Sequence, residues 1–178
     1  MELWAGSTDH ELLEVIASAR RGDLDDAGIA ALARSLAASG ETLESNTDRT
    51  ADVASTGGPS SLSTLLCPLF LRAFGWIVPK LGVPGRPAGG LDVLSRIPGY
   101  RVDLSAAEVA CVLRDCGYAH FVAGERIAPL DARLFTLRQQ TGAQTIPALV
   151  IASLLSKKIA VGVRTVGLDV RVAMHGNF

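Results

Sequence analysis

Apolar residues recur at helical spacing through the N-terminal part of the chain. One pattern predicts a helix from Asp9 to a C-terminal glycine at Gly22, and a second predicts a helix after the acidic run 23–26 that ends at Gly40. Each helix has one apolar stripe, which must be covered either by the rest of the chain or by a second copy of the protein. Residues 41–50 are polar and without periodicity, so a linker is expected there.

Beyond the linker, short apolar runs alternate with helical patterns. The runs predict strands from Asp52, at 76–80, at 119–123 and at 163–173, and the patterns predict helices at 60–74, 91–96, 105–116, 129–138 and 146–160. Because segment 60–74 is apolar nearly all round, we expect it to be buried. Strands separated by helices, with glycine turns after the strands, indicate an α/β fold with a mainly parallel sheet.

Composition narrows the class of partner. The chain has 178 residues, a net charge of −1 and 48% hydrophobic residues, so neither nucleic acid nor a membrane is expected as a partner. No signal peptide is expected at its start. The three cysteines have neither paired nor metal-ligand spacing, which favours the cytoplasm, and we expect Cys67 and Cys111 to lie in the core.

The stretch from Asp52 to Thr64 is the strongest single pattern. It passes from an extended run through a glycine pair into a helix, and this geometry directs backbone N–H groups and the positive end of a helix dipole at one spot. Its hydroxyl side chains add donors. The stretch therefore predicts a site for phosphate or another small anion, with a plain helix cap as the alternative.

Further motifs follow in a recognisable order. They are Ser55–Gly58, Ala88–Asp92, Ile97–Gly99, Ala128–Asp131 with Arg138, Ile146-Pro147, Ala152-Ser153, Lys157-Lys158 and Leu168–Val172. In residues and in order they resemble the motifs of the pyrimidine nucleoside phosphorylases, also called the thymidine phosphorylase family. The resemblance extends over roughly residues 50–172.

The resemblance implies an α/β fold of the nucleoside phosphorylase/phosphoribosyltransferase type. It implies a small helical lobe of residues 1–46, joined in space by 129–160, and a partial α/β phosphate-binding lobe of residues 51–126 and 163–178. The implied activity is phosphorolysis of pyrimidine nucleosides or deoxynucleosides to base and pentose 1-phosphate. Inorganic phosphate would be the co-substrate, with no cofactor and no metal, and the protein would be a homodimer joined through its N-terminal helices.

The resemblance also assigns site residues. The pyrimidine would be bound by Arg138, Ser153 and Lys157. Ser153 and Lys157 lie at i and i+4 on one helix face, and the two cations are donors suited to pyrimidine carbonyls. The alternative is that Arg138 and the lysines only cap helix ends. The phosphate-binding residues would be Ser55, Thr56, Gly57, Gly58 and Thr64, and Lys80 is a further candidate because of its positive charge.

Departures from the family leave other functions open. Val53-Ala54 stands where the family has Lys-His before its glycine loop, and Lys80 or Arg86 could replace the missing positive charge. The chain is also less than half as long as family members. One alternative is therefore a binding protein that holds the pyrimidine without phosphorolysis. Another alternative is an anthranilate-type phosphoribosyltransferase, although the sequence lacks the adjacent Asp-Glu pair that would bind Mg-diphosphate. A third alternative is a structural or signalling dimer.

Overall fold

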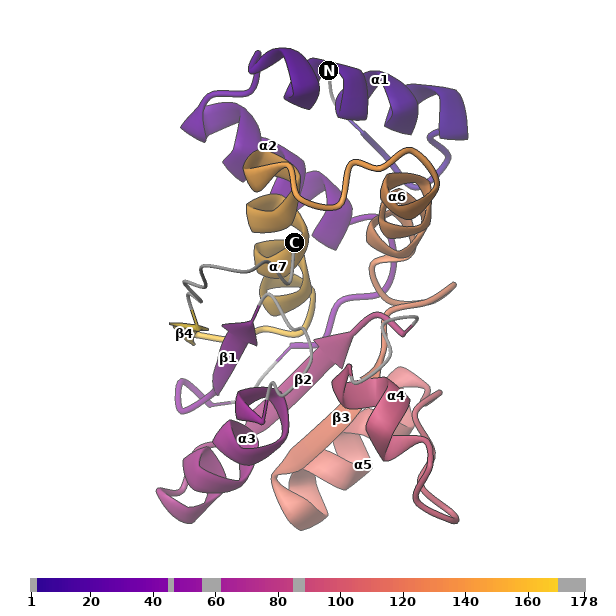
Figure 1. Ribbon diagram of the computed structural model, residues 1–178. Helices are drawn as coiled ribbons and strands as arrows, with labels where there is room; N and C mark the ends of the chain where they lie inside the picture. The colour runs from indigo at the N-terminus through magenta and orange to yellow at the C-terminus, as the bar shows by residue number, and fades with distance from the viewer. Residues whose placement is uncertain (1–2, 45–46, 56–61, 85–88, 170–178) are drawn as a thin grey trace. The chain divides into compact units, whose positions relative to one another are not determined.

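The computed structural model describes residues 3–44, 47–55, 62–84 and 89–169. The chain forms two compact units, both drawn in Figure 1. The first, here called the helical unit, contains the residues up to Thr42 and Ala123–Ala160. The second, the sheet unit, contains Leu43–Val122 and the chain after Ala160 that the structure describes. The chain therefore enters each unit twice.

The helical unit is built from α1 (Asp9–Arg21), α2 (Asp26–Ala37), α6 (Pro129–Gln140) and α7 (Pro147–Ala160). A reciprocal capping box between Thr8 and Glu11 begins α1, and Gly22 ends it in the left-handed conformation. Each N-terminal cap of this kind stabilises a helix by about 1 kcal/mol. Figure 1 shows α2 and α7 side by side, which agrees with their extensive contact.

The core of the helical unit explains what covers the N-terminal stripes. Apolar residues of α1 and α2 pack against residues of α6 and α7, and the most deeply buried of them are Leu12, Ile16, Leu36, Leu130, Leu134 and Leu149. The sequence left open whether the rest of the chain or a second copy covers these stripes. The structure shows that the rest of the chain packs on them.

The sheet unit contains β1 (Ala51–Ser55), β2 (Val78–Gly82), β3 (Tyr118–Val122) and β4 (Thr165–Asp169). Its helices are α3 (Ser63–Ala73), α4 (Gly90–Leu94) and α5 (Ala106–Cys116). Strand β1 pairs in parallel with β4, and β2 pairs in parallel with β3. A parallel bridge between Thr50 and Ile77 joins the two pairs, which gives the spatial order β4-β1-β2-β3. In sheets of this kind, ligands bind beyond the carboxyl ends of the strands.

Most predicted elements are confirmed with shifts of a few residues at their ends, and the predicted α/β class with a helical and a parallel-sheet part is confirmed. Two predictions about burial are wrong. Helix α3 exposes much of its apolar surface, and Phe70 and Phe74 are 63% and 71% exposed, because none of the described strands or helices covers that face. Cys111 is exposed on α5 instead of lying in the core.

Candidate functional site

One group of candidate side chains lies in the helical unit, on α7. Lys157 follows Ser153 by one helical turn, and both side chains are buried. The Lys157 ammonium donates to the Ser153 carbonyl at 2.7 Å and lies 2.8 Å from the Ser153 hydroxyl. The i, i+4 spacing seen in the sequence thus brings a hydroxyl and a cation to one spot.

A carboxylate from the first turn of α6 completes this group. The Oδ2 atom of Asp131 lies 2.5 Å from the Lys157 ammonium, and Asp131 is fully buried. Among the described residues, the Lys157 ammonium is the sole group that could donate a hydrogen bond to the Asp131 carboxylate. Burying an ion pair with unsatisfied oxygens costs stability, so the arrangement is typical of a functional site.

The surroundings of Lys157 alter its acidity. Burial lowers the pKa of its ammonium, and the negative charge of Asp131 opposes this change. The positive charges of Lys158 and Arg138 then lower the pKa further. Lys157 therefore releases a proton more readily than a solvated lysine, which suits a group that donates to a ligand atom gaining negative charge.

Arg138 lies in the last turn of α6 and is 2% exposed. Its guanidinium donates to three backbone carbonyls, those of Ala143 at 3.3 Å, Gln144 at 2.7 Å and Leu149 at 3.3 Å. These bonds hold the end of α6 to the segment that begins α7. The capping role considered in the sequence is therefore present, while the charge of Arg138 also acts on Lys157.

A second group lies in the sheet unit, where β1 and β4 end and α3 begins. The hydroxyls of Ser55 and Ser63 both donate to Oδ2 of Asp169, at 3.0 and 2.5 Å. Thr64 follows in the first turn of α3. A phosphate bound by Ser55 would have to take this hydroxyl from the Asp169 carboxylate. The predicted ligands Thr56, Gly57 and Gly58 lie outside the described residues.

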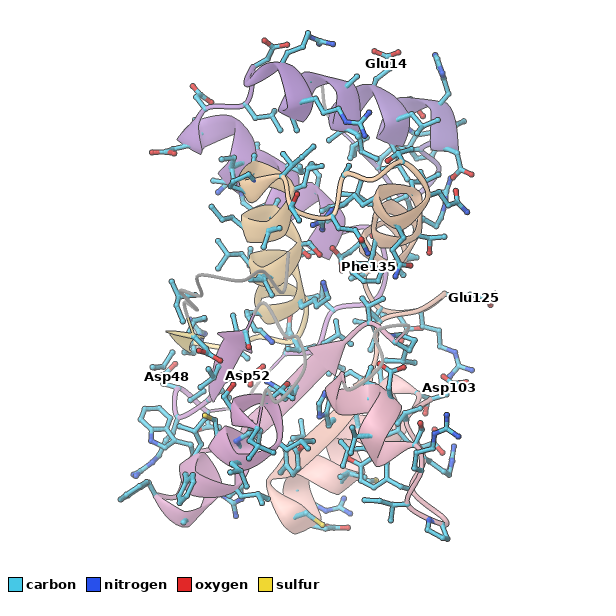
Figure 2. All side chains as sticks on the ribbon, viewed as in Figure 1. Glu14, Asp48, Asp52, Asp103, Glu125 and Phe135 are labelled. Atoms are coloured by element: carbon cyan, nitrogen blue, oxygen red, sulfur yellow. The ribbon has the colours of Figure 1, made fainter. Side chains whose placement is uncertain are left out.

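Lys80 on β2 is engaged by β1. Its ammonium lies 2.8 Å from Oδ1 of Asp52 and donates to the Val53 carbonyl at 2.9 Å. The same Asp52 oxygen accepts the Val53 backbone N–H at 2.7 Å. Asp52, labelled in Figure 2, is fully buried, and Lys80 is 4% exposed. The predicted phosphate ligand Lys80 thus forms a buried ion pair between two strands.

Sequence reasoning assigned none of the three carboxylates, Asp52, Asp131 and Asp169, to a site. Each lies in or beside a motif that carries the family resemblance. This position was the only feature of the sequence that could have marked these carboxylates as site residues. Their partners come from elements distant in sequence, so residue spacing could not reveal the contacts.

The described ranges contain no cluster of three or more histidine, cysteine, aspartate or glutamate side chains that could hold a metal ion. Within the same ranges, every helix is too short or too polar to cross a membrane.

No family model matches the chain. Curated proteins do match the chain, and the three relatives described here are all named thymidine phosphorylase. The Mycobacterium tuberculosis protein is 39% identical over 125 residues, which are 69% of this chain and 29% of that protein. The Burkholderia lata protein is 36% identical over 123 residues, covering 68% of this chain and 28% of that protein.

The match to the Sinorhizobium medicae protein is longer than these two, with 34% identity over 152 residues. Those residues cover 83% of this chain and 34% of that protein. The chain therefore spans about a third of the length of the curated relatives it matches. Similarity at this level across two thirds or more of the chain makes it a divergent member of the thymidine and pyrimidine nucleoside phosphorylase family.

Proposed function

We propose that the chain takes part in phosphorolysis of pyrimidine nucleosides or deoxynucleosides, giving free base and pentose 1-phosphate. The observation that carries the proposal is the buried group of Ser153, Lys157 and Asp131, which combines a hydroxyl, a cation and a carboxylate. The thymidine phosphorylases that match most of the chain support it. Inorganic phosphate is the co-substrate, and no other cofactor is required.

The chemistry of the reaction explains why such a group is useful. A phosphate oxygen forms a bond to the anomeric carbon while the glycosidic C–N bond breaks, and the electron pair of that bond stays on the base nitrogen. Negative charge spreads to the pyrimidine carbonyls, where donors stabilise the transition state more than the ground state. Lys157 and Ser153 are such donors, and the lowered pKa of Lys157 suits it to give the departing base its proton.

The phosphate would bind at the end of β1 and at the first turn of α3, with help from residues 56–58, which lie outside the described residues. Ser55 and Thr64 supply hydroxyls there, and the backbone of Thr56, Gly57 and Gly58 supplies N–H donors in the proposal. Lys80 adds positive charge beside β1, although Asp52 balances that charge.

The test is to incubate the chain with thymidine or uridine and phosphate, and to measure free base and pentose 1-phosphate by chromatography. Lys157→Ala should lower turnover by about 10²-fold or more, the usual loss for one transition-state donor, and Ser153→Ala should also lower it. Arg114→Ala is the matched control, since this exposed arginine pairs with its neighbour Asp115 in the sheet unit. If neither nucleoside nor base binds, the proposal is refuted.

A second candidate is binding of the pyrimidine without phosphorolysis. It is favoured by the side chains of Val53 and Ala54, which offer phosphate no donor, and by the neutralisation of Lys80 by Asp52. In that case uracil or thymine binds saturably and Lys157→Ala weakens binding, while no base is released from nucleoside. Release of base by the wild-type chain rules this candidate out.

We also propose a cytoplasmic homodimer. Because α6 and α7 cover the main stripes of α1 and α2, a dimer contact through these helices would use their remaining apolar surface, such as Leu13, which is 38% exposed. Sedimentation equilibrium of wild type and Leu13→Glu tests this contact, and an unchanged dimer in the variant would exclude it.

A further inference from the structure

Asp131 has no role of its own in the function proposed above, although its position is costly. Among the described residues, neither of its fully buried oxygens has a hydrogen-bond partner, and its one ion pair is with Lys157. Asp131 lies in the first turn of α6, just after Ala128, whose φ of 51° is in the left-handed region. Strained backbone next to a buried charge with unsatisfied oxygens is typical of a functional position.

Three oxygens surround the Lys157 ammonium, which has three N–H groups to donate. They are the Ser153 carbonyl at 2.7 Å, the Ser153 hydroxyl at 2.8 Å and Oδ2 of Asp131 at 2.5 Å. An ammonium cannot accept a hydrogen bond, so the Ser153 hydroxyl is the acceptor in its contact with Lys157. Among the described residues Lys157 is the sole partner of this hydroxyl, which therefore keeps its own hydrogen for another acceptor.

These three partners of the ammonium differ in how easily they can be released. The Ser153 carbonyl also accepts the Ser156 hydroxyl at 3.0 Å, so it remains hydrogen-bonded if Lys157 turns away. Asp131 has no second donor among the described residues, so releasing it would leave a buried carboxylate unpaired. A ligand carbonyl can therefore take the place of the Ser153 carbonyl on Lys157, whereas Asp131 has to stay bound.

We propose that Asp131 is a positioning residue, which anchors the Lys157 ammonium beside the Ser153 hydroxyl while the N–H group now on the Ser153 carbonyl turns to a pyrimidine carbonyl. The inference rests on the proposed function, because it gives Asp131 a role in the same pyrimidine site. A donor that is already held in place loses little conformational freedom when the ligand binds. Asp131 itself does not touch the ligand, and it acts through the position and the charge of Lys157.

The charge of Lys157 depends on the same carboxylate. Burial lowers the pKa of the ammonium, the positive charges of Lys158 and Arg138 lower it further, and the negative charge of Asp131 raises it. The charged residues of α1 and α2, which also contact α7, are exposed except for Glu11, which is half-buried at the cap of α1. Removing the Asp131 charge should therefore lower the pKa of Lys157, so that the cation persists only at lower pH.

The first test is the pH dependence of kcat/KM for thymidine at saturating phosphate. Asp131→Asn keeps the shape of the side chain but removes its charge, so kcat/KM should fall about tenfold or more at neutral pH. The decline of kcat/KM on the basic side should also begin at a lower pH than in wild type. Arg133→Met is the matched control on the same helix, and loss of its partly exposed pair with Asp9 should leave the profile unchanged.

The second test asks whether Asp131 acts through Lys157. In a Lys157→Ala background no ammonium is left to position, so adding Asp131→Asn should change kcat/KM by less than about threefold. If Asp131→Asn causes the same loss in this background as in wild type, the carboxylate acts independently of Lys157 and the inference is overturned.

The outcomes separate the inference from the function on which it rests. If wild type releases base and Asp131→Asn has the same pH profile, this inference is overturned and the proposed function stands. If wild type binds uracil without releasing base, Asp131→Asn should raise the Kd for uracil by about tenfold in calorimetry, and an equal Kd overturns the inference. If wild type neither binds nor cleaves nucleoside, both are overturned.

Should Asp131→Asn fail to fold by circular dichroism, Asp131→Glu decides. Its longer side chain keeps the charge but moves the carboxylate, so kcat/KM should fall severalfold while the decline on the basic side stays at the pH of wild type. A wild-type kcat/KM in Asp131→Glu would overturn the inference, because the place of the carboxylate would then not matter.

Discussion

The buried pair of Asp52 and Lys80 makes Lys80→Met a decisive substitution. The two side chains are 0% and 5% exposed, and their charged atoms are 2.8 Å apart. Removing the ammonium takes away the cation that lies 2.8 Å from this fully buried carboxylate. Breaking a buried pair in this way costs about 3–5 kcal/mol of stability. Replacing both residues, as in Asp52→Leu with Lys80→Met, removes both desolvation penalties and should cost much less.

The measurement is urea unfolding followed by tryptophan fluorescence. Trp76 lies in the sheet unit, with the Arg49 guanidinium 5.5 Å from its ring, so a Trp4→Phe background makes the signal report this unit. The matched control in the same unit is Arg114→Met, which removes a 2.8 Å pair to Asp115 whose side chains are 70% and 60% exposed. An exposed pair of this kind contributes at most about 1 kcal/mol.

Two results would refute the reasoning. One is a loss in Lys80→Met no larger than that in Arg114→Met, which would mean that the ion pair does not hold β1 and β2 together. The other is a double variant as unstable as Lys80→Met alone, because the buried Asp52 carboxylate would then not be the source of the loss.

Three further predictions concern other parts of the chain. Gly99→Ala should cost roughly 1 kcal/mol of unfolding free energy in urea, because its backbone is left-handed. Gly117→Ala should cost more, because a Cβ there would also push the Arg72 guanidinium away from the Cys116 and Trp76 carbonyls to which it donates, and equal losses would contradict this. Hydrogen bonds from the cap of α5 lower the pKa of Glu108 from 4.5 to about 2, so its stabilising contribution is present above pH 4.5 and lost as the pH falls through 2. The unfolding free energies of wild type and Glu108→Gln should therefore converge in acid, and a constant difference would refute this. Asp131→Asn should lower the pKa of Lys157 further, as followed by carbon NMR of the lysine side chain, and a higher titration midpoint would be incompatible with the buried pair.

The helices of this fold were predictable from local signals along the chain. The Ser-x-x-Glu pattern at Ser105 forms a reciprocal capping box, and Gly117 ends the same helix in the left-handed conformation. Pro129 begins α6 as predicted. Such features depend on residues within one turn of each other, which is why a single sequence reveals them.

Features that depend on distant residues were not predictable. Nothing in the sequence near α3 indicates that Phe70 and Phe74 stay exposed, because burial depends on which other segments reach that face. Lys80 looked like a cation available to phosphate, but its pairing with Asp52 depends on the alignment of two strands. In the helical unit, the spacing of Ser153 and Lys157 predicted that they share one helix face, whereas the contact with Asp131 required the packing of α6 on α7.

The way the chain enters each unit twice has a consequence for its synthesis. Strand β1 pairs with β4 in the register Ala51 to Thr165, so more than a hundred residues separate the partners. Helices α1 and α2 likewise need α6 and α7, which are made only after most of the sheet unit. Pairings with long sequence separation form slowly, and a chain leaves the ribosome from its N-terminus onward. Neither unit can therefore complete its core cotranslationally until α7 and then β4 emerge, and the apolar stripes of the first two helices stay open to chaperones until α6 and α7 have been made.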